Sequence, residues 1–308
     1  MKTTVSCLPD RPTAITIFRA SHLGMCFGVR DAIDLAVNQP EPVTILGDLV
    51  HNETVLNQLR SQGVRIEHQV AAVTTPRVMI TAHGASDRAR ADLRASGFNI
   101  VEATCPLVSF AHRAVMKLTK DGYHPVIIGK RDHVEVRGLT GDLDEFDVIL
   151  TEDDLNALRE RARFGVAAQT TQPIDRVRRL VRLLQSRFPN SEVRFVDTVC
   201  RPTKERQTAA IELARKCDVV IVVGGAHSNN TRELVNTCGR FCTRVHHVQT
   251  ALDVQPEWLA NAAKIGVTAG TSTPDNLIDE VEAKLRAFAE QRSFELQTDS
   301  LSIASAAA

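Results

Sequence analysis

The sequence predicts an α/β fold in which three βαβ domains, related by a pseudo-threefold axis, place parallel sheets around one central cavity. Three observations support this prediction. Short apolar strands alternate with amphipathic helical stretches along the 308 residues, which is typical of parallel sheets covered by helices. A unit of strand, cysteine and helix occurs three times, and each copy continues with two further strands that end in polar loops.

The repeated unit begins with a strand that runs up to a cysteine, which is followed by a helix. The three copies cover residues 14–36, 99–118 and 193–213. Their cysteines are 79 and 95 residues apart (105−26 and 200−105): Cys26, Cys105 and Cys200. Because the carboxyl ends of parallel strands meet at one edge of a sheet, we expect these three thiols to converge near the axis.

Two polar loops follow each cysteine helix. The first loops come after strands expected at 43–46, 126–129 and 219–223, and the second after strands at 78–81, 164–168 and 265–268. In chain order, the side chains presented by these loops are His51, His83, His133, Thr170, Ser228, Asn230 and Ser272. All of them should face the same cavity as the cysteines.

The repeat also predicts the domain organisation. We expect domains over residues 14–104, 105–196 and 197–292, with flexible termini at 1–13 and 293–308. The sequence leaves open whether the opening strand, which leads to Cys26, packs with the third domain instead of the first.

Composition excludes several classes of partner. The formal net charge is zero and the basic residues are scattered, so we expect no nucleic-acid partner. No apolar run approaches the roughly 18 residues of a membrane span, and the start lacks a secretory signal, so we expect a cytoplasmic protein away from membranes. Seven cysteines, an odd number, do not indicate a disulfide framework in a chain of this length. Four of them lie outside the repeat, and we interpret these as structural thiols: Cys7, Cys217, Cys238 and Cys242.

Three thiols with an open fourth direction favour a metal centre that carries out chemistry. Zinc would need a fourth protein ligand or a water molecule. An iron–sulfur cube usually takes four cysteines, so three leave one iron open to a substrate. The residues alone leave both metals possible.

The polar loops favour an anionic ligand such as a diphosphate. Their histidine, serine and asparagine side chains stand at expected helix starts, where free N–H groups and the helix dipole attract anions. The same serine and asparagine residues could instead only cap helices. The absence of a glycine-rich phosphate loop argues against a nucleotide.

Among the side chains singled out in these loops, Glu135 is the only carboxylate. Beside His133 in a closed cavity, it is a candidate proton donor whose pKa burial would adjust. Thr170 could orient a substrate hydroxyl or hold Glu135 in place.

The motifs GMCFGV, HNETV, TAHG, ATCPLV, HVEVRG, AAQTT, HSNNT and AGTSTPD, in register from about residue 15 to 290, resemble those of the 4-hydroxy-3-methylbut-2-enyl diphosphate reductase family. The resemblance implies a three-domain cloverleaf and one [4Fe–4S] cluster, held by three cysteines with an open fourth iron. It also implies reductive removal of the substrate hydroxyl to give isopentenyl and dimethylallyl diphosphate, the last step of the methylerythritol phosphate pathway, with electrons from ferredoxin or flavodoxin.

The resemblance assigns roles residue by residue. The cluster ligands would be Cys26, Cys105 and Cys200, and the catalytic residues Glu135 as proton donor, with His133 and Thr170 beside it. The substrate-binding residues would be His51, His83, His133, Thr170, Ser228, Asn229, Asn230 and Ser272. The chain departs from the family pattern at Val134, Asn229 and the charged segment that begins at Arg201, none of which removes a group that the chemistry needs.

Two other functions are consistent with parts of the pattern. Quinolinate synthase also has three repeats and three cluster cysteines, but the AHG, HSNNT and HVE motifs argue against it. A non-catalytic metal or cluster protein would need no anion-binding loops.

Overall fold

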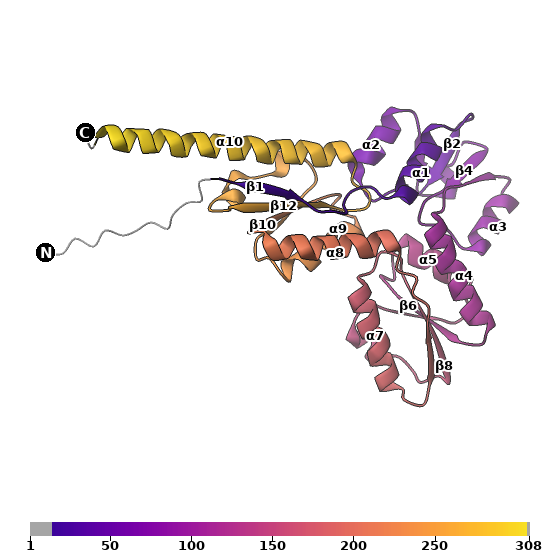
Figure 1. Cartoon of the computed structure of the whole chain (residues 1–308). Helices are drawn as coiled ribbons and strands as arrows, with labels where there is room; N and C mark the ends of the chain where they lie inside the picture. Colours follow the sequence, from indigo (N-terminus) through magenta and orange to yellow (C-terminus); the bar gives the residue numbers. More distant parts are fainter. Residues whose placement is uncertain (1–13, 307–308) are drawn as a thin grey trace.

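The computed structural model describes the backbone of residues 14–306 and the side chains of residues 14–292. It contains three four-stranded sheets whose strands are all parallel, with helices between successive strands (Figure 1). The predicted α/β class with three parallel sheets is therefore confirmed. We call the sheets, with the helices that pack on them, the first, second and third units.

Each unit has four strands and several helices. The first contains α1 (Phe27–Val37), β2 (Val43–Leu46), α2 (Glu53–Ser61), β3 (Arg65–Glu67), η1 (Val70–Ala72), β4 (Arg77–Ile80), α3 (Asp87–Ala95) and β5 (Asn99–Glu102). The second contains α4 (Pro106–Lys120), β6 (His124–Ile128), α5 (Val134–Thr140), β7 (Asp147–Ile149), α6 (Glu152–Asn156), β8 (Arg163–Ala168), α7 (Ile174–Arg187) and β9 (Glu192–Phe195). The third contains β1 (Thr16–Arg19), α8 (Arg201–Lys216), β10 (Val219–Val223), α9 (Asn229–Gly239), β11 (Val245–Val248), η2 (Ala251–Asp253), η3 (Pro256–Leu259), β12 (Lys264–Ala269) and α10 (Asp275–Ala306).

The three sheets have the same strand order. Read from one edge, they run β5-β4-β2-β3, β9-β8-β6-β7 and β1-β12-β10-β11. Each sheet therefore has at one edge a strand that leads to a cysteine. The strands that precede the polar loops occupy the two central positions, where both neighbours hold them in register. In β10, all five residues are buried, as expected for a strand covered on both faces.

The chain changes units at each cysteine. β5 belongs to the first sheet, but α4, which begins after Cys105, packs in the core of the second unit. β9 and α8 make the equivalent crossing at Cys200. The first strand, whose assignment the sequence left open, pairs with β12 in the third sheet, whereas α1 packs in the core of the first unit. Residues 105 and 197 remain our proposed domain boundaries.

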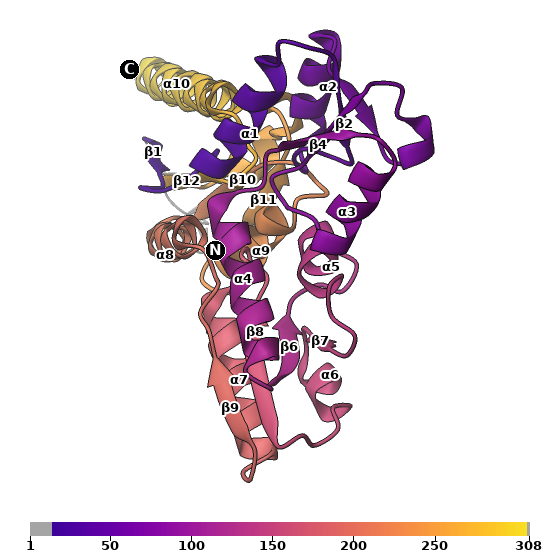
Figure 2. The same cartoon turned by 90° about the vertical axis from the view of Figure 1, so that its right-hand side faces the viewer.

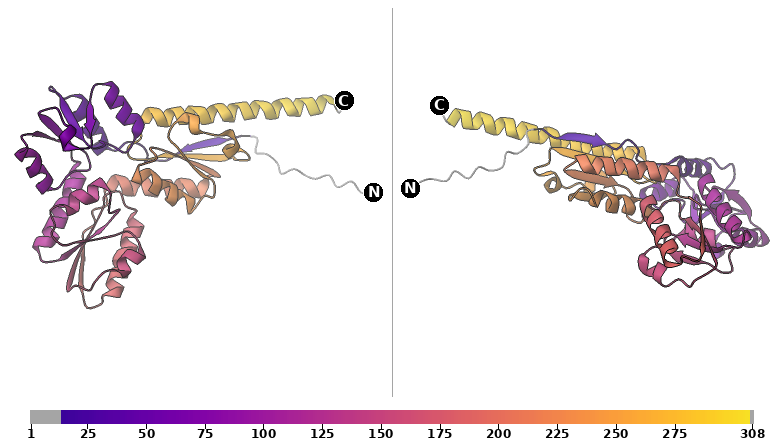
Figure 3. Two further views of the ribbon diagram at one scale, coloured as in Figure 1. Left: turned by 180° about the vertical axis from the view of Figure 1, so that it is seen from behind. Right: turned by 60° about the horizontal axis from the view of Figure 1, so that its bottom comes forward.

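The C-terminal region differs from its expectation. Residues 293–306 were expected to form a flexible tail, but they continue α10, which projects well beyond the third unit (Figures 1 and 3). After the first turns of a helix have formed, each further residue adds one backbone hydrogen bond, so the helix can extend through this segment. The expected tail at residues 1–13 lies outside the described residues.

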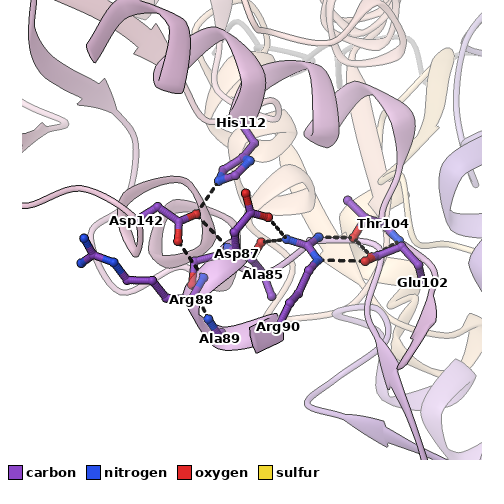
Figure 4. A network of polar contacts seen from close by, with 10 residues as sticks. Ala85, Asp87, Arg88, Ala89, Arg90, Glu102, Thr104, His112 and Asp142 are labelled. Carbon is purple, nitrogen blue, oxygen red and sulfur yellow. Dashed lines mark hydrogen bonds and ion pairs between the residues drawn. The ribbon is translucent and has the colours of Figure 1, made fainter. Parts of the chain in front are cut away.

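A network of polar contacts joins the first and second units (Figure 4), where α3 lies beside α5 (Figure 2). The carboxylate of Asp142, which follows α5, accepts hydrogen bonds from the backbone N–H groups of Asp87 and Arg88, both at 2.8 Å. It also lies 2.8 Å from Nε2 of His112 on α4. Asp142 thus caps α3 of the first unit and holds the end of α5 against it.

We expect Asp142→Ala to lower the free energy of unfolding by about 1–3 kcal/mol, because two backbone N–H groups lose their acceptor. Urea denaturation followed by circular dichroism measures this change. Asp144→Ala is the matched control, since Asp144 has an exposed side chain and pairs only with Arg88 in this network. Equal effects of the two substitutions would contradict the role given to Asp142.

Candidate functional site

The three repeated cysteines occupy the same position in each unit. Cys26, Cys105 and Cys200 are the N-cap residues of α1, α4 and α8, and none of their side chains caps its helix. All three thiols are free and partly buried. The sulfur atoms are therefore available as ligands at helix ends, where the helix dipole stabilises a thiolate.

The segments that carry the cysteines approach one another. A Cβ atom placed on Gly28 would be 2.5 Å from Sγ of Cys105, so the first turn of α1, directly after Cys26, touches the second cysteine. Cys26 and Glu135 also act electrostatically on both Cys105 and Cys200. The structure thus brings the three cysteines together with Glu135.

Burial opposes the ionisation of two of the thiols in the metal-free protein. Burial raises the pKa of Cys105, and it raises the pKa of Cys200 to about 11; the charges of Cys26 and Glu135 act in the same direction. Thiols of this kind lose their protons when a metal ion binds them. Three soft sulfur ligands on three helix N-termini fit zinc or an iron–sulfur centre, and they do not fit a hard cation such as magnesium.

Three histidines from two units meet next to this cluster of thiols. The ring centroids of His51 and His83 are 4.6 Å apart, and His133 lies 5.2 Å from His51 and 5.5 Å from His83. One ring nitrogen of each histidine lies within 4.8 Å of the corresponding nitrogens of the other two, so this group could also hold a metal ion. The alternative use of the same nitrogens is to donate hydrogen bonds to an anion.

The protonation states of the three histidines favour an anion as their ligand. Burial lowers the pKa of His51 and of His83, and it lowers the pKa of His133 to about 3. Nδ1 of His133 accepts the backbone N–H of Glu135 at 3.2 Å, so the proton of this neutral ring is on Nε2. Neutral rings of this type are hydrogen-bond donors.

The third unit adds donors from the starts of α9 and α10. Ser228 caps α9 by accepting the N–H of Thr231, as the simpler interpretation of this serine predicts. Oδ1 of Asn230 accepts the N–H of Thr271 at 3.0 Å. Four buried atoms from the predicted binding residues have no hydrogen-bond partner: Nε2 of His51, Nδ2 of Asn229, Nδ2 of Asn230 and Oγ of Ser272. Buried donors without partners are costly, and the oxygens of an anion would satisfy them.

Glu135 has the properties of a proton donor. Its residue is 1% exposed, and its carboxylate accepts the backbone N–H of Thr170 at 2.6 Å. Burial raises the pKa of Glu135 to about 7, although hydrogen bonds from Thr170 act in the opposite direction. A substantial fraction of this side chain is therefore protonated near neutral pH. Thr170 was considered as a residue that orients the substrate hydroxyl or that holds Glu135, and the structure shows its contact with Glu135.

Some residues of the site were not among the predicted ones. Asn52 donates from Nδ2 to the carbonyl of Ser272 at 2.9 Å and so joins the first and third units; its place beside His51 in the HNE motif was a usable signal. A Cβ on Gly225 would lie 2.4 Å from the carbonyl oxygen of His51, a close approach that no pattern in the sequence indicates. The structural thiols Cys217, Cys238 and Cys242 are buried in the third unit, and Cys7 lies outside the described residues.

Comparison with known proteins identifies the family. A family model described as "LytB protein" matches residues 17–286, which is most of the chain. The chain belongs to this family. It is 34% identical to the 4-hydroxy-3-methylbut-2-enyl diphosphate reductase of Geobacter metallireducens over 88% of this chain and 96% of that protein. The reductase of Aquifex aeolicus is 33% identical over 90% of this chain and 98% of its own.

Solved structures agree with this family assignment. A structure of (E)-4-hydroxy-3-methyl-but-2-enyl diphosphate reductase, titled the terminal enzyme of the non-mevalonate pathway, superposes with a TM-score of 0.65 at 33% identity, covering 89% of this chain and 99% of that one. The reductase of Plasmodium falciparum superposes with a TM-score of 0.81 at 28% identity, covering 87% and 86%. These matches favour the reductase over the two alternatives. No helix in the described part of this family member is both long and apolar enough to cross a membrane.

The contact between Gly28 and Cys105 gives a prediction. We expect Gly28→Ala to reduce the iron and sulfide bound per chain after anaerobic reconstitution, because the added methyl group displaces the sulfur of Cys105. Gly239→Ala is the control, since a Cβ there has no neighbour within 4 Å. Full iron and sulfide content in Gly28→Ala would show that this contact does not matter for the metal centre.

The raised pKa of Glu135 predicts a pH dependence of stability. Its pKa is about 7 in the folded protein and 4.5 as a free side chain, so the folded state binds more protons and loses stability as pH rises through this range. Gln does not titrate. We therefore expect Glu135→Gln to stabilise the cluster-free protein above pH 7, by at most about 3 kcal/mol, with no gain below pH 4. Urea denaturation at several pH values tests this, and a pH-independent difference would contradict it.

Proposed function

We infer that the chain catalyses the reaction of a 4-hydroxy-3-methylbut-2-enyl diphosphate reductase. This reaction replaces the hydroxyl of the substrate by hydrogen and gives isopentenyl or dimethylallyl diphosphate, the terminal step of the non-mevalonate pathway. The observation that carries the inference is the group of buried, unpartnered donors beside three free thiols. Relatives and solved structures across nearly the whole chain carry the same name.

We propose that the cofactor is one [4Fe–4S] cluster bound by Cys26, Cys105 and Cys200, with its fourth iron open. When bound, such a cluster supplies single electrons and a Lewis-acidic iron. Support comes from the three equivalent N-cap positions and from the approach of the first turn of α1 to Sγ of Cys105.

The proposed diphosphate site lies beside the cysteines, where neutral donors converge. His51, His83 and His133 would donate from ring nitrogens, and the amides and hydroxyls of the third unit would donate from the opposite side: Ser228, Asn229, Asn230 and Ser272. Because these donors are neutral, they do not balance the charge of the diphosphate. The helix N-termini and cations outside the site would balance it. Arg232 and Lys130 already act electrostatically on His51 and His133.

Glu135 would supply protons to the substrate. The reaction takes up two electrons and two protons, breaks one C–O bond, forms one C–H bond and releases water. A carboxyl group that holds its proton near pH 7 can donate it to the leaving hydroxyl, and the N–H of Thr170 then stabilises the carboxylate that remains. Thr170 would also orient the substrate hydroxyl.

Two parts of the proposal concern the surroundings of the enzyme. The electrons would come from a reduced ferredoxin or flavodoxin. A reducing compartment, the cytoplasm, would keep the three ligand thiols free of disulfides.

The test is an anaerobic assay of reconstituted protein with the substrate and reduced methyl viologen. We expect both five-carbon diphosphates from the wild type, and turnover reduced about a hundredfold or more in Glu135→Gln, since a general acid contributes at least this much. Glu53→Gln is the matched control: Glu53 is also in the first turn of a helix after a polar loop, but it is exposed and pairs with Arg60.

Each contrary result has a definite meaning. Normal turnover in Glu135→Gln would remove Glu135 as proton donor. A loaded cluster with no turnover in the wild type would refute the proposed substrate.

A further inference from the structure

Arg206 is a buried cation held entirely by carbonyl groups. It lies on α8, six residues after Cys200, and is 7% exposed. Its Nε and Nη2 donate to the carbonyl oxygen of Gly24 at 3.0 and 2.6 Å, and Nη1 donates to that of Pro202 at 3.0 Å. Within the described residues, no carboxylate forms an ion pair with it.

A buried charge without a counter-ion costs several kcal/mol. Burial lowers the pKa of Arg206, and the strongest favourable influences on its charge come from Cys26 and Cys200 as thiolates, ahead of Glu205. Glu205 is itself engaged with Arg201 on the surface of α8. Ligand thiols lose their protons when they bind a metal, so a metal centre on Cys26 and Cys200 would supply the negative charge that balances the buried guanidinium.

The contacts of Arg206 also join two of the three crossings between units. Gly24 precedes Cys26 by two residues, and Pro202 follows Cys200 by two. Gly24 has φ of +73°, and a Cβ there would lie 2.8 Å from Ile278, so its carbonyl is held in one orientation. One guanidinium thus connects the segment that carries the first ligand to the helix that carries the third.

We propose that Arg206 is a positioning residue and the fixed counter-charge of the metal centre, which it keeps bound and shifts to a more positive reduction potential. This inference rests on the proposed function, because it requires the centre that Cys26, Cys105 and Cys200 would hold. Reduction adds a negative charge to the centre, and a nearby cation stabilises the reduced form. Removing the cation should therefore make the centre harder to reduce.

Two substitutions separate the charge of Arg206 from its hydrogen bonds. Arg206→Gln keeps a donor but removes the charge, whereas Arg206→Lys keeps the charge but loses one of the two bonds to Gly24. Arg201→Gln is the matched control, because Arg201 directly follows Cys200 but is exposed and paired with Glu205.

The experiment reconstitutes each protein anaerobically with iron and sulfide and measures its midpoint potential by spectroelectrochemical titration. The rate of iron loss to a chelator and the thermal unfolding of the cluster-free protein are measured on the same preparations. We expect a more negative potential and iron loss about tenfold faster in Arg206→Gln. Arg206→Lys and Arg201→Gln should stay close to the wild type, and all cluster-free proteins should unfold at similar temperatures.

Three results would overturn the proposal. An unchanged potential and iron-loss rate in Arg206→Gln would show that its charge does not act on the centre. Equal losses in Arg206→Gln and Arg206→Lys, with lower unfolding temperatures of both cluster-free proteins, would show a purely structural role. Failure of the wild type to assemble any cluster would instead refute the proposed cofactor, and with it the premise about Arg206.

Discussion

The geometry of the whole molecule depends on the way the chain leaves each sheet. At Cys26, Cys105 and Cys200 it passes from an edge strand of one unit directly into a helix of the next. Because this occurs three times, polar side chains that follow the carboxyl ends of strands in different units come into contact. The site is therefore made at the junctions between units, and no single unit contains it.

This arrangement concentrates positive helix ends and neutral donors in a buried volume with few fixed negative charges. Such a volume suits an anion, and burial has a different effect on each group in it. It keeps the three histidine rings neutral, keeps a proton on Glu135 near pH 7 and opposes ionisation of Cys105 and Cys200. The same low dielectric strengthens each interaction that a bound ligand makes there.

The repeat made the fold and most of the site predictable from the sequence. Equivalent positions in parallel sheets must lie at one edge, so the meeting of His51, His83 and His133 followed from spacing alone. Contacts that do not recur in the three repeats could not be predicted. Arg206 donates to Gly24, which is 182 residues away in the sequence, and Asp142 caps a helix of another unit. The C-terminal helix was missed for a different reason, because a stretch of alanine and serine without a core pattern resembles a tail.

The pairing of β1 with β12 sets an order of events during synthesis. Thr16 is among the first described residues to leave the ribosome, yet its partner in the sheet is Lys264, near the end of the chain. The strand that leads to Cys26 therefore stays unpaired until almost the whole polypeptide has been made. The second unit can fold earlier, but the junction at Cys26 closes last. The cavity that the three cysteines share is therefore completed only when β12 has joined the third sheet.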